Sequence, residues 1–168
     1  MIHGFTRLTI TGLLLCSLAA PAMAQVDPSK LMEQLSSKNE QERLEAIDAV
    51  AKLGPNAPVQ LVRALARFLT VGTTEERWRA ARAIAAIGPA AANDAVSALV
   101  ECLRHKDPLV RAYCAHALGK MGKAARNADN VVGELVRLAV DKNRLVRREA
   151  REALLAIEAP PEVTLPLL

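Results

Sequence analysis

The chain has 168 residues, of which 51% are hydrophobic and only 2% aromatic, and its formal net charge is +4. This length allows one domain with a core of its own. A core built almost without aromatic side chains favours closely packed helices over a β-sandwich. The mild positive charge comes from interspersed bases and acids, so it does not by itself indicate a nucleic-acid-binding protein.

The first 24 residues have the composition of a secretion signal. His3 and Arg7 form a short basic region, an apolar run follows at 8–20, and residues 22–24 (Ala-Met-Ala) give the small-x-small pattern that precedes a cleavage site. We expect cleavage after Ala24, which leaves a domain of residues 25–168 in the periplasm or outside the cell, not attached to a membrane. An uncleaved membrane anchor is the alternative, although the apolar run is short for a span.

Beyond this segment, one pattern occurs four times with periods of 34, 34 and 36 residues. Each copy has an arginine, a small residue at the third and sixth positions after it, an aliphatic residue or Met at the seventh and tenth, and then glycine. The arginines are Arg43, Arg77, Arg111 and Arg147, and only the last copy replaces the glycine, with Glu158. Because the spacing follows the helical period, each copy predicts a helix with one buried face.

The beginnings of these helices are predicted independently of their apolar faces. Four residues before each arginine stands a good N-cap residue: Asn39, Thr73, Asp107 and Asn143. In the first two copies, Glu42 and Glu76 occupy the position that completes a capping box.

A second, apolar helix is predicted between successive copies, at about residues 62–69, 96–103 and 132–139, with Gly88-Pro89 at one of the turns. Each unit is therefore a helical hairpin that buries its apolar faces only by stacking on its neighbours. The predicted fold is all-α, a short α-solenoid of about four stacked hairpins. The Pro-rich residues 158–168 are expected to form a cap or a tail.

The third copy carries a family resemblance. Its opening, Asp107-Pro108-Leu109-Val110-Arg111, and its closing Gly122 resemble the second half of a HEAT repeat, and the short period is similar to the HEAT-like repeats of phycobilisome lyases. The resemblance covers about residues 28–158. It implies that the arginine-bearing helices line the concave face, and it is specific for the fold rather than for an activity.

No catalytic or cofactor-binding motif stands out in the sequence. The one grouping of metal-ligand residue types consists of Cys102, His105, Cys114 and His116. Cys114 and His116 are two residues apart, which separates them by about 200° around a helix, so they cannot bind one ion. The repeat register places the two cysteines on neighbouring helices at different heights. We therefore expect two buried thiols rather than a zinc site or a disulfide.

The recurring arginines allow two interpretations. They hold adjacent repeats and turns together, as the resemblance implies, or they form a row that binds a ligand. A separate group comes from the positions that point away from the buried face in the two central repeats. It consists of Trp78, Arg79, Arg82, Tyr113, His116 and Lys120.

Trp, Tyr and Arg dominate the hot spots of protein interfaces. The sequence therefore favours an exported, non-enzymatic scaffold, without cofactor or metal, that binds an unidentified protein or peptide on its concave face through this group. In the structural alternative, Trp78 lies across the groove between repeats and stiffens the array.

Two other functions are compatible with the repeat type. One is a nucleic-acid-binding HEAT-like module in which Arg79, Arg82 and Lys120 contact phosphates. Export and nearby acidic residues argue against this function, so no nucleic acid is expected. The other is a non-catalytic subunit of a bilin-lyase-like complex.

Overall fold

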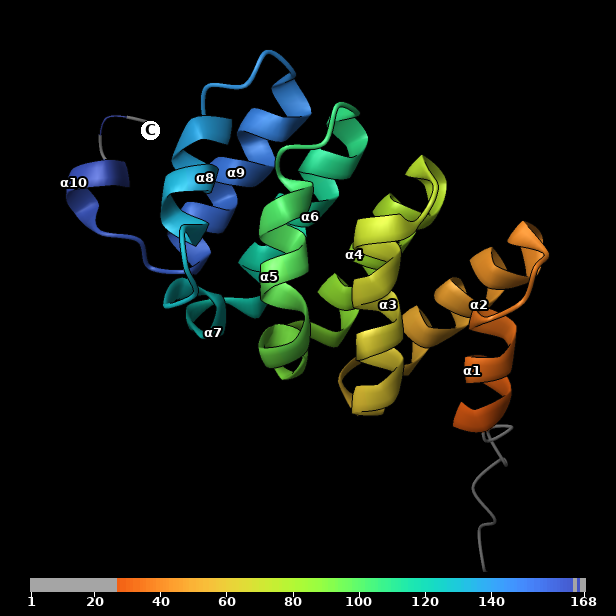
Figure 1. The fold of residues 1–168 in the computed structure, drawn as a ribbon. Helices are drawn as coiled ribbons and strands as arrows, with labels where there is room; N and C mark the ends of the chain where they lie inside the picture. Colours follow the sequence, from red (N-terminus) through yellow and green to blue (C-terminus); the bar gives the residue numbers. More distant parts are fainter. Residues whose placement is uncertain (1–26, 165, 167–168) are drawn as a thin grey trace, which may run out of the picture.

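The computed structural model describes residues 27–164 and residue 166, and this part of the chain consists of helices and turns (Figure 1). Four helices carry the recurring arginines: α2 (Glu40–Leu53), α4 (Thr74–Ile87), α6 (Pro108–Met121) and α9 (Arg144–Ala156). Four others precede them: α1 (Pro28–Leu35), α3 (Val59–Val71), α5 (Ala92–Cys102) and α8 (Val131–Leu138). The remaining elements are short: α7 (Lys123–Arg126), α10 (Pro161–Thr164) and the 3-10 turns η1 (Gly54–Asn56) and η2 (Gly88–Ala91).

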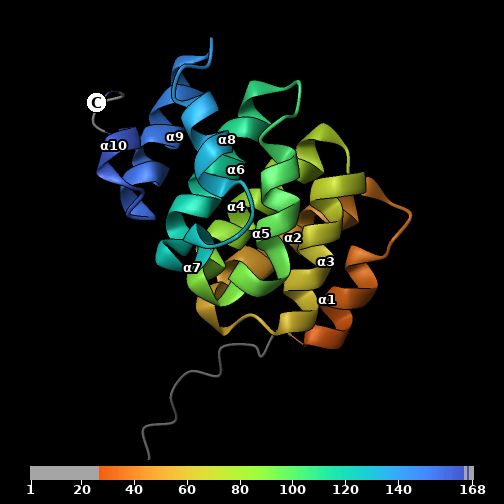
Figure 2. The same cartoon turned by 60° about the vertical axis from the view of Figure 1, so that its left-hand side comes forward.

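The helices form two layers, which Figures 1 and 2 show from two directions. Neighbouring helices in the row α2, α4, α6 and α9 pack directly on one another, whereas in the other row α5 and α8 make little contact. The closer spacing makes the arginine-bearing row the inner, concave layer. The predicted α-solenoid of stacked hairpins is confirmed.

All four predicted N-caps are confirmed. In α6, for example, Asp107 Oδ1 accepts a hydrogen bond from the Leu109 N–H at 2.8 Å. The capping box forms in α4, where Thr73 and Glu76 bond each other's backbone N–H. In α2 the predicted box is wrong.

The difference in α2 arises from Ser37. The Ser37 hydroxyl accepts the N–H of Asn39 at 3.1 Å and donates to Glu42 at 2.5 Å. The Ser37 hydroxyl thus links the Asn39 N–H to the Glu42 carboxylate, whereas a capping box would join these two groups directly.

The glycines that close the inner helices are required by their backbone conformation. Gly54, Gly88 and Gly122 have φ of +53°, +71° and +58°, the region that residues with a Cβ adopt at a cost. At the same point in the fourth copy, Glu158 has φ of +53°. The chain thus keeps the turn where the sequence has lost the glycine.

One core of Ala, Leu, Ile and Val side chains runs through the array. The two-residue insertion before α8 is accommodated by the extra helix α7 and by Asn130, which is left-handed with φ of +63°. Within the described residues, one stretch is long and apolar enough to cross a membrane, Thr74–Cys102. The turn η2 divides it into two helices, and half of its most apolar window is buried.

At the C-terminal end, the chain folds back on the last repeat. Helix α10 contacts α9, and Ala159 and Thr164 are buried. The predicted signal segment, with cleavage after Ala24, lies outside the described residues and stays a prediction.

Candidate functional site

The six residues singled out from the sequence come from two adjacent inner helices, Trp78, Arg79 and Arg82 from α4 and Tyr113, His116 and Lys120 from α6. The rings of Trp78 and Tyr113 stack across the boundary between these helices, with centroids 5.4 Å apart and an angle of 28° between the planes. Both rings are half-buried. The structural alternative for Trp78 is therefore correct in its geometry, since the ring bridges two repeats, and each ring still presents part of its surface to solvent.

The two arginines are held against the Trp78 ring. Their guanidinium carbons lie 5.3 Å (Arg79) and 5.5 Å (Arg82) from its centroid. Both also bind Asp48 of α2, at 2.7 and 2.6 Å, and Arg79 binds Glu75 at 2.6 Å. Because these two guanidinium groups are already paired with carboxylates, they hold the Trp78 ring in place and are not free to bind a phosphate.

His116 links α6 to the last inner helix. Its Nδ1 lies 2.9 Å from Glu149 Oε2, and Arg148 binds the other oxygen of Glu149 at 2.6 Å. The pair separates two shallow depressions on the concave face, of about 140 and 130 Å³, both of which His116 lines. Tyr113 lines the first and Lys120 the second.

The first depression is the more apolar of the two. Its wall combines Ala112, Tyr113 and Leu145 with the polar groups of His116, Arg148 and Glu149. Its size suits a single side chain of a bound partner.

The sequence did not identify every residue of this surface. Asp48 and Glu149 are not among the six predicted residues, yet they bind three of them, Arg79, Arg82 and His116. Leu44 and Ala112 follow their arginines by one position, as Trp78 does, but both are buried. Ala112 lies in α6, which packs between α4 and α9, so only a narrow strip of that helix is open to solvent.

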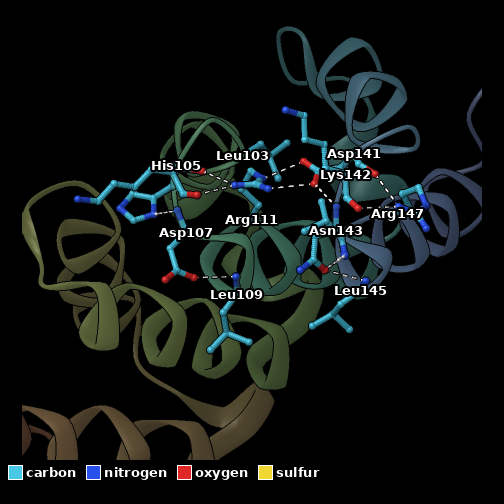
Figure 3. A network of polar contacts seen from close by, with 12 residues as sticks. Leu103, His105, Asp107, Leu109, Arg111, Asp141, Lys142, Asn143, Leu145 and Arg147 are labelled. Atoms are coloured by element: carbon cyan, nitrogen blue, oxygen red, sulfur yellow. Dashed lines mark hydrogen bonds and ion pairs between the residues drawn. The ribbon is translucent and has the colours of Figure 1, made fainter.

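The recurring arginines bind the turns that precede their own helices. Arg111 donates from Nη1 to the carbonyl oxygens of His105 and Lys106 at 2.8 and 2.9 Å (Figure 3). Arg147 makes the same arrangement one repeat later, and the arginines of the first two copies also bind carbonyls of their turns.

Two of these arginines also reach a carboxylate of the next repeat. Arg43 Nε lies 2.6 Å from Glu76, and Arg111 binds both oxygens of Asp141 at 3.0 Å. Burial of Asp141 opposes its ionisation, but the hydrogen bonds from Arg111 and from the Asn143 N–H outweigh it and hold the pKa of Asp141 below its usual value. The structural interpretation of the arginines is confirmed.

Cys102 and Cys114 are both free and buried, as expected. The Cys102 thiol donates a hydrogen bond to the carbonyl oxygen of Leu69 at 2.9 Å. His116 pairs with Glu149 on the concave face. Within residues 27–164, no group of three or more His, Cys, Asp or Glu side chains is arranged to hold a metal ion.

Stacked helical hairpins in two layers, joined by a repeated arginine network, define an α-solenoid. A family model described as HEAT repeats matches residues 69–154, and the chain belongs to this family. No match is found among curated proteins.

Three solved structures illustrate the likeness. Two engineered proteins are 26% and 24% identical, with TM-scores of 0.67 and 0.66; each match covers 84% of this chain and 68% or 69% of the other. A designed armadillo repeat protein, solved in complex with the peptide (KR)4, is 21% identical with a TM-score of 0.66, over 83% of this chain and 71% of that chain. These proteins are similar to the chain in fold.

Proposed function

We propose that the chain is an exported, non-enzymatic scaffold that binds an extended peptide segment of another protein on its concave face. The observation that carries the proposal is the stacked Trp78–Tyr113 pair, which is fixed by Arg79 and Arg82 and borders an apolar depression between α6 and α9. Aromatic anchors that are rigid before binding lose little conformational freedom when a partner arrives.

The fold supports this mode of binding. A designed armadillo repeat protein of similar fold was solved in complex with a peptide, and the inner helices of this chain pack side by side in one layer. On that surface the partner's backbone would lie along the row α4, α6 and α9, with one apolar side chain in the depression bordered by Tyr113 and Leu145. His116 and Lys120 would contact polar groups beside it. Export rests on the composition of residues 1–24.

The ion pairs of Arg79 and Arg82 with Asp48 weigh against nucleic-acid binding. A phosphate would have to displace a carboxylate from each arginine, and the acids Glu149 and Glu152 lie on the same face.

The test is a selection of binding peptides from a displayed random library, followed by affinity measurements on variants. Tyr113→Ala removes the wall of the depression and leaves the ionic cluster around Trp78 in place. We expect it to weaken the selected peptides by roughly tenfold or more. Val71→Ser, at an exposed position of α3 in the outer layer, is the matched control and is expected to bind normally.

Circular dichroism melting shows whether each variant is folded. Selected peptides that bind Tyr113→Ala as tightly as wild type, or that lose affinity on Val71→Ser, would place the binding surface elsewhere and refute the proposed site.

A further inference from the structure

The last inner helix, α9, has an open side next to the depression that Tyr113 borders. A second depression of about 880 Å³ lies against this side, and arginine is the commonest residue in its wall. The two depressions share Leu145 and Arg148, so they are adjacent. We call the arginines of the larger depression the arginine face; they are Arg144, Arg147, Arg148 and Arg151.

The residues on this side of α9 differ from those at the equivalent positions of α6. In α6, Ala112 is buried, and a Cβ on Gly119 would lie only 3.1 Å from the Ala153 Cα of α9. The equivalent positions of α9 carry Arg148 and Leu155, and Leu155 is 52% exposed. These long side chains prevent another inner helix from packing as closely. The open side is therefore unsuited to a second copy of the chain stacked as a further repeat.

Most of the charge on the arginine face has no carboxylate partner. Among the described residues, only Arg148 of the four arginines forms ion pairs, with Glu149 and Glu152. Arg147 Nη1 and Arg151 Nε donate instead to backbone carbonyls between α8 and α9, at 2.8 and 3.3 Å. A carbonyl orients a guanidinium group without neutralising its charge, and the other N–H groups remain available to an anion.

We propose that the arginine face binds acidic residues of the peptide whose apolar side chain occupies the depression beside Tyr113. The inference rests on the proposed peptide-binding function and names the chemistry of the partner, an apolar residue with Asp or Glu a few residues away. Arginine suits this task because its guanidinium group binds a carboxylate with two parallel hydrogen bonds.

The composition of the surface favours a peptide over a nucleic acid. Leu145 and Leu155 lie among the arginines and offer apolar contacts to side chains. Glu152 lines the same depression and Glu149 the adjacent one, and these carboxylates would repel a backbone with a phosphate at every nucleotide. A peptide can place its few acidic residues opposite the arginines and a neutral residue opposite Glu152.

The experiment repeats the selection from a displayed random peptide library on three forms of the full-length chain: wild type, Arg144→Glu and Arg67→Glu. Arg144 is the exposed first residue of α9, where a glutamate suits the positive end of the helix dipole, so this variant is expected to fold. Arg67 is exposed on α3 in the outer layer, and its substitution makes the same change in net charge. We expect wild type and Arg67→Glu to enrich Asp and Glu near an apolar residue. Arg144→Glu should reduce this enrichment.

Affinity measurements on the selected peptides give the size of the effect. Replacing the acidic residues of a peptide by their amides should weaken its binding to wild type by roughly tenfold at physiological salt, and by less at high salt. Arg144→Glu should weaken the acidic peptide by roughly fivefold and should bind the amide peptide like wild type. Circular dichroism melting shows whether each variant is folded.

The outcomes separate this inference from the proposed function. Peptides that depend on Tyr113 but show no acidic enrichment would overturn the acidic partner and leave the peptide site in place. The same follows if Arg67→Glu loses the acidic peptides as Arg144→Glu does. Acidic peptides that depend on Arg144 but not on Tyr113 would retain the arginine face and refute the site beside Tyr113. A library that yields no binding peptide overturns both.

A single-stranded DNA oligonucleotide of 20 nucleotides serves as a further probe in the same assay. Because a dense polyanion is expected to be repelled by the two glutamates, it should bind more weakly than the selected acidic peptides at physiological salt. Tighter binding that Arg144→Glu abolishes would assign the arginine face to nucleic acid and overturn the proposal.

Discussion

The arginine network predicts a specific cost for the substitution Arg111→Ala. The change removes two bonds to Asp141 and two to the carbonyls of the turn before α6. The Arg111 and Asp141 side chains are 15% and 10% exposed, so the substitution leaves a largely buried carboxylate without its cation. Breaking a buried pair in this way costs about 3–5 kcal/mol, and the residual exposure places our estimate at about 3 kcal/mol at pH 7.

This loss is expected to depend on pH in a defined direction. The pKa of Asp141 is lower in the folded than in the unfolded chain, so its stabilisation is complete above the unfolded pKa of about 3.9 and disappears as the pH falls through the folded value. The difference in unfolding free energy between wild type and Arg111→Ala should therefore shrink in acid.

Urea unfolding, followed by far-UV circular dichroism and by the fluorescence of Trp78, measures both effects. Arg147→Ala is the matched control, because Arg147 binds two carbonyls in the same way but pairs with no carboxylate in the described chain. It should cost about 1–2 kcal/mol. Arg111→Ala in an Asp141→Asn background should cost no more than this control.

A loss below about 1 kcal/mol for Arg111→Ala would show that the network does not hold the repeats together. A loss that is equal at all pH values, or equal in the Asp141→Asn background, would show that the carboxylate is not the partner that matters. The slope of the unfolding free energy against urea concentration must be the same for all variants. A different slope would indicate that part of the repeat array unfolds separately.

Four further substitutions follow from the repeat structure, and urea unfolding tests each of them. Thr73→Ala removes the capping box of α4 and should cost about 1 kcal/mol, whereas an unchanged midpoint would mean that the cap is not needed. Glu158→Gly places a glycine at a positive φ and should raise the free energy of unfolding by about 1 kcal/mol. Gly122→Ala should lower it by a similar amount. Changes of the same sign would contradict the argument from backbone conformation. His105→Asp should raise the free energy of unfolding by up to about 1 kcal/mol at pH 7, because the new carboxylate would pair with Arg77 as Asp141 pairs with Arg111 one repeat later. A loss of stability would show that the two turns are not equivalent.

His105 also makes stability depend on pH. Burial and the Arg77 cation lower its pKa in the folded chain, so protonation opposes folding. Stability should fall as the pH drops below the unfolded value of about 6.5 toward the folded pKa. In His105→Asp this loss should be absent between pH 7 and 5, and a wild-type chain with constant stability over the same range would contradict it.

The elements that the sequence predicts correctly are those determined within one helix. Asn39, Thr73, Asp107 and Asn143 cap their helices because a short polar side chain bonds the first turn wherever the helix lies. The positive φ at Gly122 is equally local. Such features need no knowledge of the neighbouring repeat.

The features that the sequence did not predict depend on how one repeat is offset against the next. Asp48 reaches two arginines because α2 and α4 lie side by side with a particular shift. The packing of α6 between α4 and α9 likewise buries Ala112. The apolar pattern of one segment predicts which face of its helix is buried, but the offset of that helix along its neighbour is determined by packing.

Each inner helix has some positions that hold the fold together and others that are free to vary, which explains why a binding surface arises at the centre of the array. The recurring arginine and the small residues after it are committed to turns and neighbours, so a substitution there weakens the fold. The two positions directly after the arginine differ between repeats, and they carry Trp78 in one repeat and Tyr113 in the next. Stacking of these rings needs only two adjacent repeats, and Asp48 binds both arginines that lie over the Trp78 ring. The structural network therefore holds the aromatic pair rigid before any partner binds, and that rigidity lowers the entropic cost of binding.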